Sequence, residues 1–172
     1  MFSGPFRVTL TRPTASTGAL QMDARSQPPR SSSAPSATVL VVDDDDGIRE
    51  SLSDLLNGEG YLVFTAPDGL SALDRLRSHP SPLIVLLDWM MPRMDGLAVL
   101  RAVAADAAEV ADVQAHVFIV LTAAIEKFTQ RLRLDGPAIP FYLSVTVLGK
   151  PFDVAEVLVL VARAATYIRN RA

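Results

Sequence analysis

Residues 83–96 read LIVLLDWMMPRMDG, an apolar run that ends on a single acid. Five apolar residues, 83–87, precede Asp88, and a proline and an Asp-Gly pair follow it. A short run rich in Leu, Ile and Val is typical of a strand buried on both faces, as in a parallel sheet. Asp88 is therefore predicted at the carboxyl end of a strand, which is the edge where ligands bind in open α/β sheets.

Further apolar runs alternate with segments of helical periodicity along the rest of the chain. Strands are predicted at 39–42, 61–66, 83–87, 116–122 and within 141–149. Helices are predicted after Asp45 or Asp46, after the turn at 67–69, from about Gly96, over about 124–134 and over about 153–170. Five repeats of strand then helix predict an α/β fold, a doubly wound five-stranded parallel sheet with helices on both faces.

Residues 1–36 differ in composition from the remainder of the 172-residue chain. They are rich in Ser, Thr, Pro and Arg and lack apolar periodicity, which predicts a disordered basic arm before a single domain at 37–172. The arm holds four arginines and one acid, Asp23, for a net charge of +3. Met22 offers an alternative natural start, in which residues 1–21 would be absent from the cell.

Composition excludes several classes of function. The residues after the arm hold 12 basic and 18 acidic side chains, a net charge of −6, which argues against nucleic-acid binding as the main role. The longest uncharged stretch, 136–149, has 14 residues and two prolines, too short and broken for membrane insertion. The chain has no cysteine, so thiolate metal sites and disulfides are excluded, and a cytoplasmic location is expected.

Parallel strands bring their carboxyl ends to one edge, where polar side chains would converge. Each of them alone has a structural explanation, as a solvated turn, a helix cap, a strand residue or a surface lysine. Together, several close carboxylates raise one another's pKa, and a divalent cation removes that penalty. Oxygen ligands favour Mg²⁺ over Zn²⁺, and the set is suited to phosphoryl chemistry with a carboxylate nucleophile. The predicted set is Asp43, Asp44, Asp88, Thr122 and Lys150.

The segment from residue 38 to about 170 resembles the receiver domain of two-component response regulators. The motifs are VVDD at 41–44, LLDWMMPRMDG at 86–96, IVLTA at 119–123 and GKPF at 149–152. In build it is similar to the single-domain chemotaxis regulator. The resemblance implies the flavodoxin-like receiver fold and a phosphoprotein that carries an aspartyl phosphate in a phosphorelay.

The resemblance also implies a role for each matched residue. Asp88 would be the phospho-acceptor, Thr122 would bind the phosphoryl group, and Lys150 would pair with it. Mg²⁺ would be held by Asp43, Asp44, Asp88 and the backbone carbonyl of Met90. Lys150 and Pro151 would be joined by a cis peptide bond, a form that occurs almost only before proline.

The fifth predicted strand departs from the family pattern. The usual aromatic of the switch lies three residues before the lysine, where this chain has Val147. Tyr142-Leu143 resembles the family's Tyr-Leu but lies further upstream, since the spacing from Thr122 to Lys150 is some six residues longer than usual. Either the loop before the strand is longer, or the extra residues bulge out between Tyr142 and Lys150. Partner recognition is the property that this departure affects.

The acceptor site has a second departure, in residues that flank it. Met90 and Ala124 stand where polar side chains often orient the hydrolytic water, and both are apolar. We expect slow self-dephosphorylation.

These residues predict a stand-alone receiver module that is not an enzyme. A histidine kinase or a histidine phosphotransfer protein would donate the phosphoryl group, and an unknown protein target would read it by contact; homodimerisation is left open. One alternative is an unphosphorylated receiver-like interaction module. Another is a Mg²⁺-dependent phosphohydrolase with an aspartyl-phosphate intermediate, which usually needs a second acid where Met90 stands.

Overall fold

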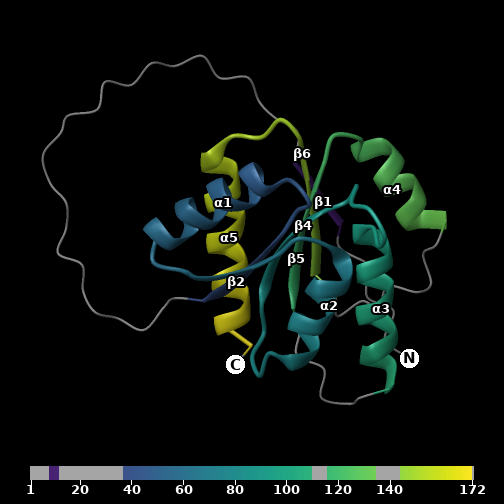
Figure 1. Cartoon of the computed structure of the whole chain (residues 1–172), viewed down its shortest axis with the longest axis horizontal. Coiled ribbons are helices and arrows are strands. Elements are labelled where there is room, and N and C mark those ends of the chain that lie inside the picture. The colour runs from purple at the N-terminus through teal and green to yellow at the C-terminus, as the bar shows by residue number, and fades with distance from the viewer. Residues whose placement is uncertain (1–7, 12–36, 110–115, 135–143, 172) are drawn as a thin grey trace, which may run out of the picture.

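A computed structural model describes residues 8–11, 37–109, 116–134 and 144–171. They form one fully parallel sheet with strand order β1-β6-β5-β4-β2-β3 (Figure 1). The strands are β1 (Val8–Thr11), β2 (Thr38–Val42), β3 (Leu62–Ala66), β4 (Ile84–Asp88), β5 (Val117–Thr122) and β6 (Ser144–Gly149). The helices are α1 (Asp46–Gly58), α2 (Gly69–Ser78), α3 (Gly96–Glu109), α4 (Ile125–Leu134) and α5 (Val154–Arg169). The predicted α/β fold is confirmed, with all five expected strands and five expected helices.

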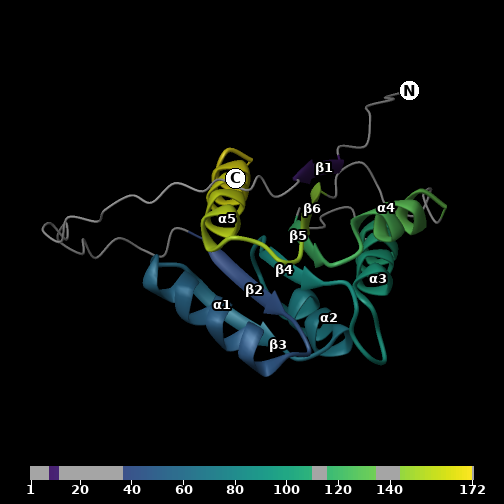
Figure 2. The same cartoon turned by 90° about the horizontal axis from the view of Figure 1, so that it is seen from above.

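Successive strand residues point to opposite faces of the sheet, and this divides the apolar core in two. In β2, Leu40 and Val42 belong to the core formed with α2, α3 and α4, whereas Val39 and Val41 belong to the core formed with α1 and α5. Figure 2 shows these two groups of helices on opposite sides of the sheet. Both faces of the central strands are therefore buried, which explains their nearly continuous apolar sequence. No helix in the described ranges is long and apolar enough to cross a membrane.

Aspartates begin α1, α2, α3 and α5, each by accepting a hydrogen bond from a backbone N–H of the first turn. Asp45 accepts from Ile48 N at 2.9 Å, so Asp45 rather than Asp46 caps α1. Asp68 caps α2 and Asp153 caps α5. These caps fix where the chain turns from the sheet edge into each helix.

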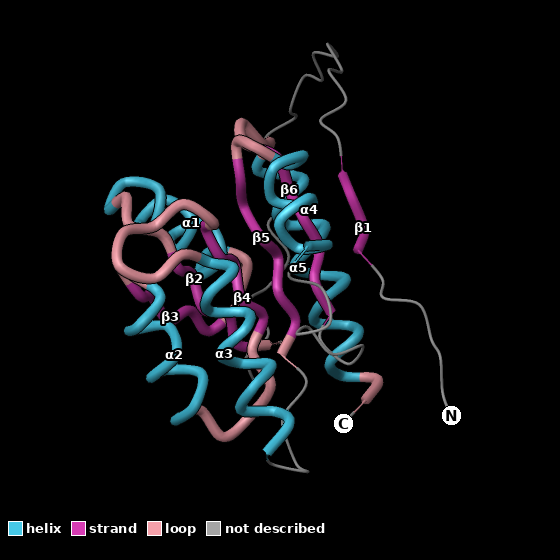
Figure 3. Tube along the Cα trace, turned by 90° about the vertical axis from the view of Figure 1, so that its right-hand side faces the viewer, coloured by secondary structure: helices cyan, strands magenta, loops and turns pink. Residues whose placement is uncertain are grey.

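The extra strand β1 lies within the segment for which the sequence predicts a disordered arm. Val8–Thr11 pairs in parallel with β6, from Val8 beside Val145 to Thr11 beside Leu148. Figure 3 shows β1 at the outer edge of the sheet. The prediction of disorder is therefore wrong for these four residues, and the sheet has six strands rather than five. The rest of residues 1–36 lies outside the described residues.

The pairing of β6 with β5 limits where the extra residues of the lengthened segment can lie. The register is continuous from Val117 beside Ser144 to Thr122 beside Gly149. No bulge therefore interrupts β6, and the extra residues precede Ser144. Tyr142 and Leu143 lie outside the described residues.

One residue of α5 departs from the helical periodicity of its buried face. Val154, which the helical periodicity places inward, is 52% exposed because it lies in the first turn of α5. Leu160 and Ala164 are buried on that helix instead.

Candidate functional site

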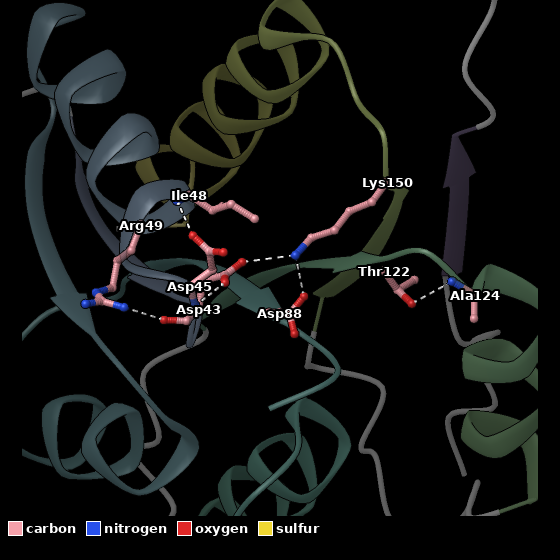
Figure 4. Close-up of polar contacts among 8 residues, drawn as sticks. All are labelled: Asp43, Asp45, Ile48, Arg49, Asp88, Thr122, Ala124 and Lys150. Carbon is pink, nitrogen blue, oxygen red and sulfur yellow. Dashed lines mark hydrogen bonds and ion pairs between the residues drawn. The ribbon is translucent and has the colours of Figure 1, made fainter. Parts of the chain in front are cut away.

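Four strands deliver polar residues to one edge of the sheet (Figure 4). Asp43 follows β2, Asp88 ends β4, Thr122 ends β5 and Lys150 follows β6. Because β4 lies between β2 and β5, Asp88 lies between Asp43 and Thr122. The edge that the sequence predicts as a site thus brings these four residues together.

Lys150 joins the two buried carboxylates of the site. Its Nζ donates to Asp88 Oδ1 at 2.6 Å and to Asp43 Oδ2 at 3.0 Å. Asp43 is 1% exposed and Asp88 is 5% exposed, so both charges are largely withdrawn from water. The Lys150 backbone is held at the end of β5, since its N–H donates to Thr122 O at 2.8 Å. The Lys150–Pro151 peptide bond is cis. One cation therefore compensates two acids.

Burial and pairing act in opposite directions on these groups. Burial raises the pKa of the Asp88 carboxyl above its ordinary value, and Lys150, which lowers it, offsets only part of this effect. The neighbouring charge of Asp43 raises the pKa of Asp88 further. Burial lowers the pKa of the Lys150 ammonium, but its bonds to Asp88 and Asp43 outweigh this and leave that pKa raised. Asp88 is thus a more basic carboxylate than an ordinary aspartate, and a more basic oxygen is a better nucleophile.

The loop after β2 holds Asp43 in place. Asp45 N donates to Asp43 Oδ1 at 2.9 Å, and Arg49 Nη1 donates to the Asp43 carbonyl at 2.8 Å. Arg49 also forms an ion pair with Asp46. The sequence gives no indication of this role for Arg49. Asp44, the other predicted ligand in this loop, is exposed to solvent.

The side chains at this edge of the sheet can be compared with the ligands that Mg²⁺ prefers. Within the described ranges, no three His, Cys, Asp or Glu side chains converge as a metal-binding cluster. Mg²⁺, however, is usually held by only one or two protein carboxylates and keeps several waters. Asp43 and Asp88 supply two buried carboxylates, and their repulsion adds to the effect of burial in raising the pKa of Asp88. A divalent cation would relieve that repulsion, so the residues fit Mg²⁺.

Thr122 borders the site on the side of α4. It is 1% exposed, and its Oγ1 accepts from Ala124 N at 3.0 Å, at the turn into α4. Val147, the residue at the usual aromatic position, is fully buried beside Val120 of β5. An aliphatic side chain therefore fills this place in the core.

The loop after Asp88 folds back on the end of β4. Trp89 N donates to Leu121 O at 3.1 Å, and Gly96 N donates to Trp89 O at 3.0 Å. A Cβ at Gly96 would lie 2.5 Å from Asp88 O, so only glycine fits there. Met90 lies two residues after the acceptor in this loop, and its side chain is 68% exposed to solvent.

A family model described as "Response regulator receiver domain" matches residues 39–162, most of the chain. The chain belongs to the response regulator receiver family. The receiver segment is 34% identical over 119 residues to sporulation initiation phosphotransferase F of Bacillus subtilis, covering 69% of this chain and 86% of that protein. It is 38% identical over 123 residues to response regulator MprA of Mycobacterium bovis, covering 72% of this chain. The match spans only 48% of the length of MprA.

Solved structures agree with the receiver assignment. Chemotaxis protein CheY4 of Vibrio cholerae superposes with a TM-score of 0.59 at 28% identity, over 74% of this chain and 98% of CheY4. The resemblance to a receiver domain of two-component systems, and its flavodoxin-like fold, are therefore confirmed.

Proposed function

We propose that this receiver accepts a phosphoryl group on Asp88 from a histidine kinase or a histidine phosphotransfer protein. The contact that carries the proposal is the one between Asp88 and Lys150. Asp88 ends a central strand, its carboxylate is buried and more basic than usual, and an ammonium lies 2.6 Å from it. An ammonium in this place neutralises charge on a phosphoryl group as it arrives.

In the proposed reaction a carboxylate oxygen of Asp88 forms a bond to phosphorus while the phosphorus–nitrogen bond of the donor's phosphohistidine breaks. The electron pair of that bond leaves with the imidazole nitrogen, which takes up a proton. The product is an acyl phosphate on Asp88. Lys150 pairs with the new phosphoryl oxygens, and the Thr122 hydroxyl, which already accepts from Ala124 N, donates its own hydrogen to one of them.

Mg²⁺ would be held by Asp43, Asp44, Asp88 and the carbonyl of Met90. When bound, it supplies positive charge against the phosphoryl oxygens. Asp43 is fixed for this role by Asp45 and Arg49, which leaves few conformations for its carboxylate.

Phosphorylation would act as a switch by changing the charge at one strand end. The group that compensates Asp43 and Asp88 is Lys150, and it follows β6 directly. Moving Lys150 toward the phosphate therefore alters the end of β6 and the turn of Thr122 and Ala124 that begins α4. We propose that a target protein in the cytoplasm reads this change by contact.

The proposal is tested by incubating the protein with acetyl phosphate and Mg²⁺ and measuring its intact mass. We expect an adduct of about 80 Da, one phosphoryl group, on the natural chain. Asp88→Asn should abolish the adduct. Asp95→Asn is the matched control, since Asp95 caps α3 through Ala98 N in the same loop and asparagine caps equally well. No adduct on the natural chain would favour an unphosphorylated interaction module instead.

A further inference from the structure

The loop between Asp88 and α3 contains a strained turn at 92–94. Met94 N donates to Pro92 O at 2.8 Å, a hydrogen bond that closes a three-residue turn around Arg93. Arg93 has φ of 67°, and in the described ranges it is the one non-glycine residue with positive φ. Both the tight turn and the positive φ are unfavourable for a side chain as large as arginine. Contacts elsewhere must hold this conformation.

The turn before α2 supplies those contacts. Arg93 forms an ion pair with the Asp68 carboxylate, and the next residue of the loop, Met94, packs against Gly69. A Cβ at Gly69 would lie 2.7 Å from both Met94 Cγ and Met94 O, so a larger residue there would push the two turns apart. Arg93 and Met94 of one turn therefore contact Asp68 and Gly69 of the other, and these contacts form a clamp between the two turns.

Asp68 is a rigid anchor for this clamp. It is 4% exposed, and it accepts from Ser71 N at 2.9 Å as the cap of α2. That backbone hydrogen bond, above all, holds the pKa of Asp68 below its ordinary value, and Arg93 lowers it further. Asp68 is therefore a fixed negative charge, while the Arg93 side chain is 65% exposed and is positioned by the pairing.

The strained turn lies in the middle of the loop that surrounds the phospho-acceptor. This loop is closed by the bond from Gly96 N to Trp89 O, so a shift at its tip is passed back to Met90 and to the end of β4. We propose that the Asp68–Arg93 ion pair is a latch that holds this loop, and with it the Met90 carbonyl, in the geometry for binding Mg²⁺. Arg93 and Asp68 are thus positioning residues. The metal part of this inference rests on the proposed function.

A glycine at position 93 makes it possible to remove the Asp68–Arg93 ion pair and the backbone strain at the same time. Glycine adopts positive φ freely, so Arg93→Gly removes both the ion pair and the backbone strain that the ion pair opposes. Arg93→Ala removes the ion pair but keeps the strain. Asp68→Asn removes the charge while preserving the cap of α2. If the ion pair acts as a latch, Asp68→Asn should loosen the loop when residue 93 is arginine. It should have little effect when residue 93 is glycine.

Two measurements on the full chain test the latch. The first is amide hydrogen exchange of Met94 and Gly96 without metal; the second is the Kd for Mg²⁺, read from the fluorescence of Trp89, the chain's single tryptophan. For Arg93→Ala and Asp68→Asn we expect faster exchange and a Kd raised roughly three- to tenfold, while Arg93→Gly stays within about twofold of the natural chain. Asp68→Asn added to Arg93→Gly should change neither value further. Thermal melts verify that each variant folds.

Three results would overturn the latch. Unchanged Met94 exchange in Asp68→Asn would mean that the ion pair does not hold the turn. Faster exchange with an unchanged Kd would mean that the turn does not position the metal site. Equal loss in Arg93→Ala and Arg93→Gly would mean that arginine itself, rather than relief of strain, is required. If the natural chain binds no Mg²⁺, the proposed function fails, and the exchange measurement still tests whether the ion pair holds the turn.

Discussion

Lys150 Nζ lies 2.6 Å from Asp88 Oδ1, although 61 residues of chain separate the two in sequence. The same ammonium reaches Asp43 at 3.0 Å, so it is the shared counter-ion of two buried acids. Removing it would leave both carboxylates buried and uncompensated, a situation that is costly in a protein interior.

Lys150→Met should destabilise the fold at pH 7. We expect the free energy of unfolding to fall by roughly 1–3 kcal/mol, less than for a fully buried pair because Lys150 is partly exposed. Without the ammonium the pKa of Asp88 rises further in the folded state, so the penalty applies above that pKa and disappears as the carboxyl protonates at lower pH. Urea unfolding at pH 7 and pH 5 measures this. Lys127→Met, at an exposed site on α4, is the control and should change little.

His116 should make stability depend on pH. It is 6% exposed, and its Nδ1 accepts from Leu83 N at 3.0 Å, so the ring is neutral in the fold. Burial lowers its pKa from 6.5 to about 4. The unfolded chain binds a proton below about pH 6.5 and the folded chain does not, so stability is full above that pH and is lost as the pH falls toward 4.

This loss should amount to about 3 kcal/mol between pH 6.5 and 4. His116→Asn keeps an acceptor for Leu83 N but does not titrate, so unfolding curves of this variant should lack that part of the pH dependence. Equal slopes for the variant and the natural chain would contradict the assignment.

Met90 should set the lifetime of the phosphorylated state. Its side chain is 68% exposed and apolar beside the acceptor, so it offers no group to orient a hydrolytic water. Met90→Asn should shorten the half-life of the phosphoryl adduct on the order of three- to tenfold. Decay of the adduct is followed by mass after the donor is removed. Met90→Leu, which adds no polar group, should leave the half-life unchanged, and an unchanged half-life in Met90→Asn would refute the role.

Strand β1 should protect the outer edge of β6. The pairing of Val8–Thr11 with β6 covers backbone groups that an edge strand would otherwise leave unpaired. Thr9→Pro combined with Leu10→Pro removes two adjacent N–H groups, one of which faces β6 in any register. Amides of β6 that face β1 should then exchange at least roughly tenfold faster. The exchange of β6 amides that face β5 should not change. Ala19→Pro is the control and should change no amide of β6. Equal exchange in the natural chain, the double variant and the control would contradict the pairing.

The convergence of the candidate site residues can be predicted from the sequence because strand topology places them. Once the strands are parallel, Asp43, Asp88, Thr122 and Lys150 must reach one edge, and no side-chain detail is needed for that. The same reasoning missed Arg49 and the Asp68–Arg93 pair. Those contacts depend on how loops fold over one another, which apolar periodicity does not report.

The errors in the fold have equally local causes. Strand β1 is a four-residue run inside a Ser- and Pro-rich segment, and its pairing depends on the free edge of β6 rather than on any signal of its own. Val154 fits the helical period of α5, but it lies in the first turn next to the cap. Periodicity gives the face of a helix and does not say where the covering sheet ends.

Asp88 is the residue that we propose carries the phosphoryl group. Borohydride reduces an acyl phosphate on aspartate to homoserine, so treatment of the phosphorylated protein marks the acceptor permanently. Peptide mass spectrometry of the reduced protein should find homoserine at position 88 and aspartate at positions 43 and 44. Homoserine at another aspartate, or a phosphoryl adduct that yields none, would contradict the account.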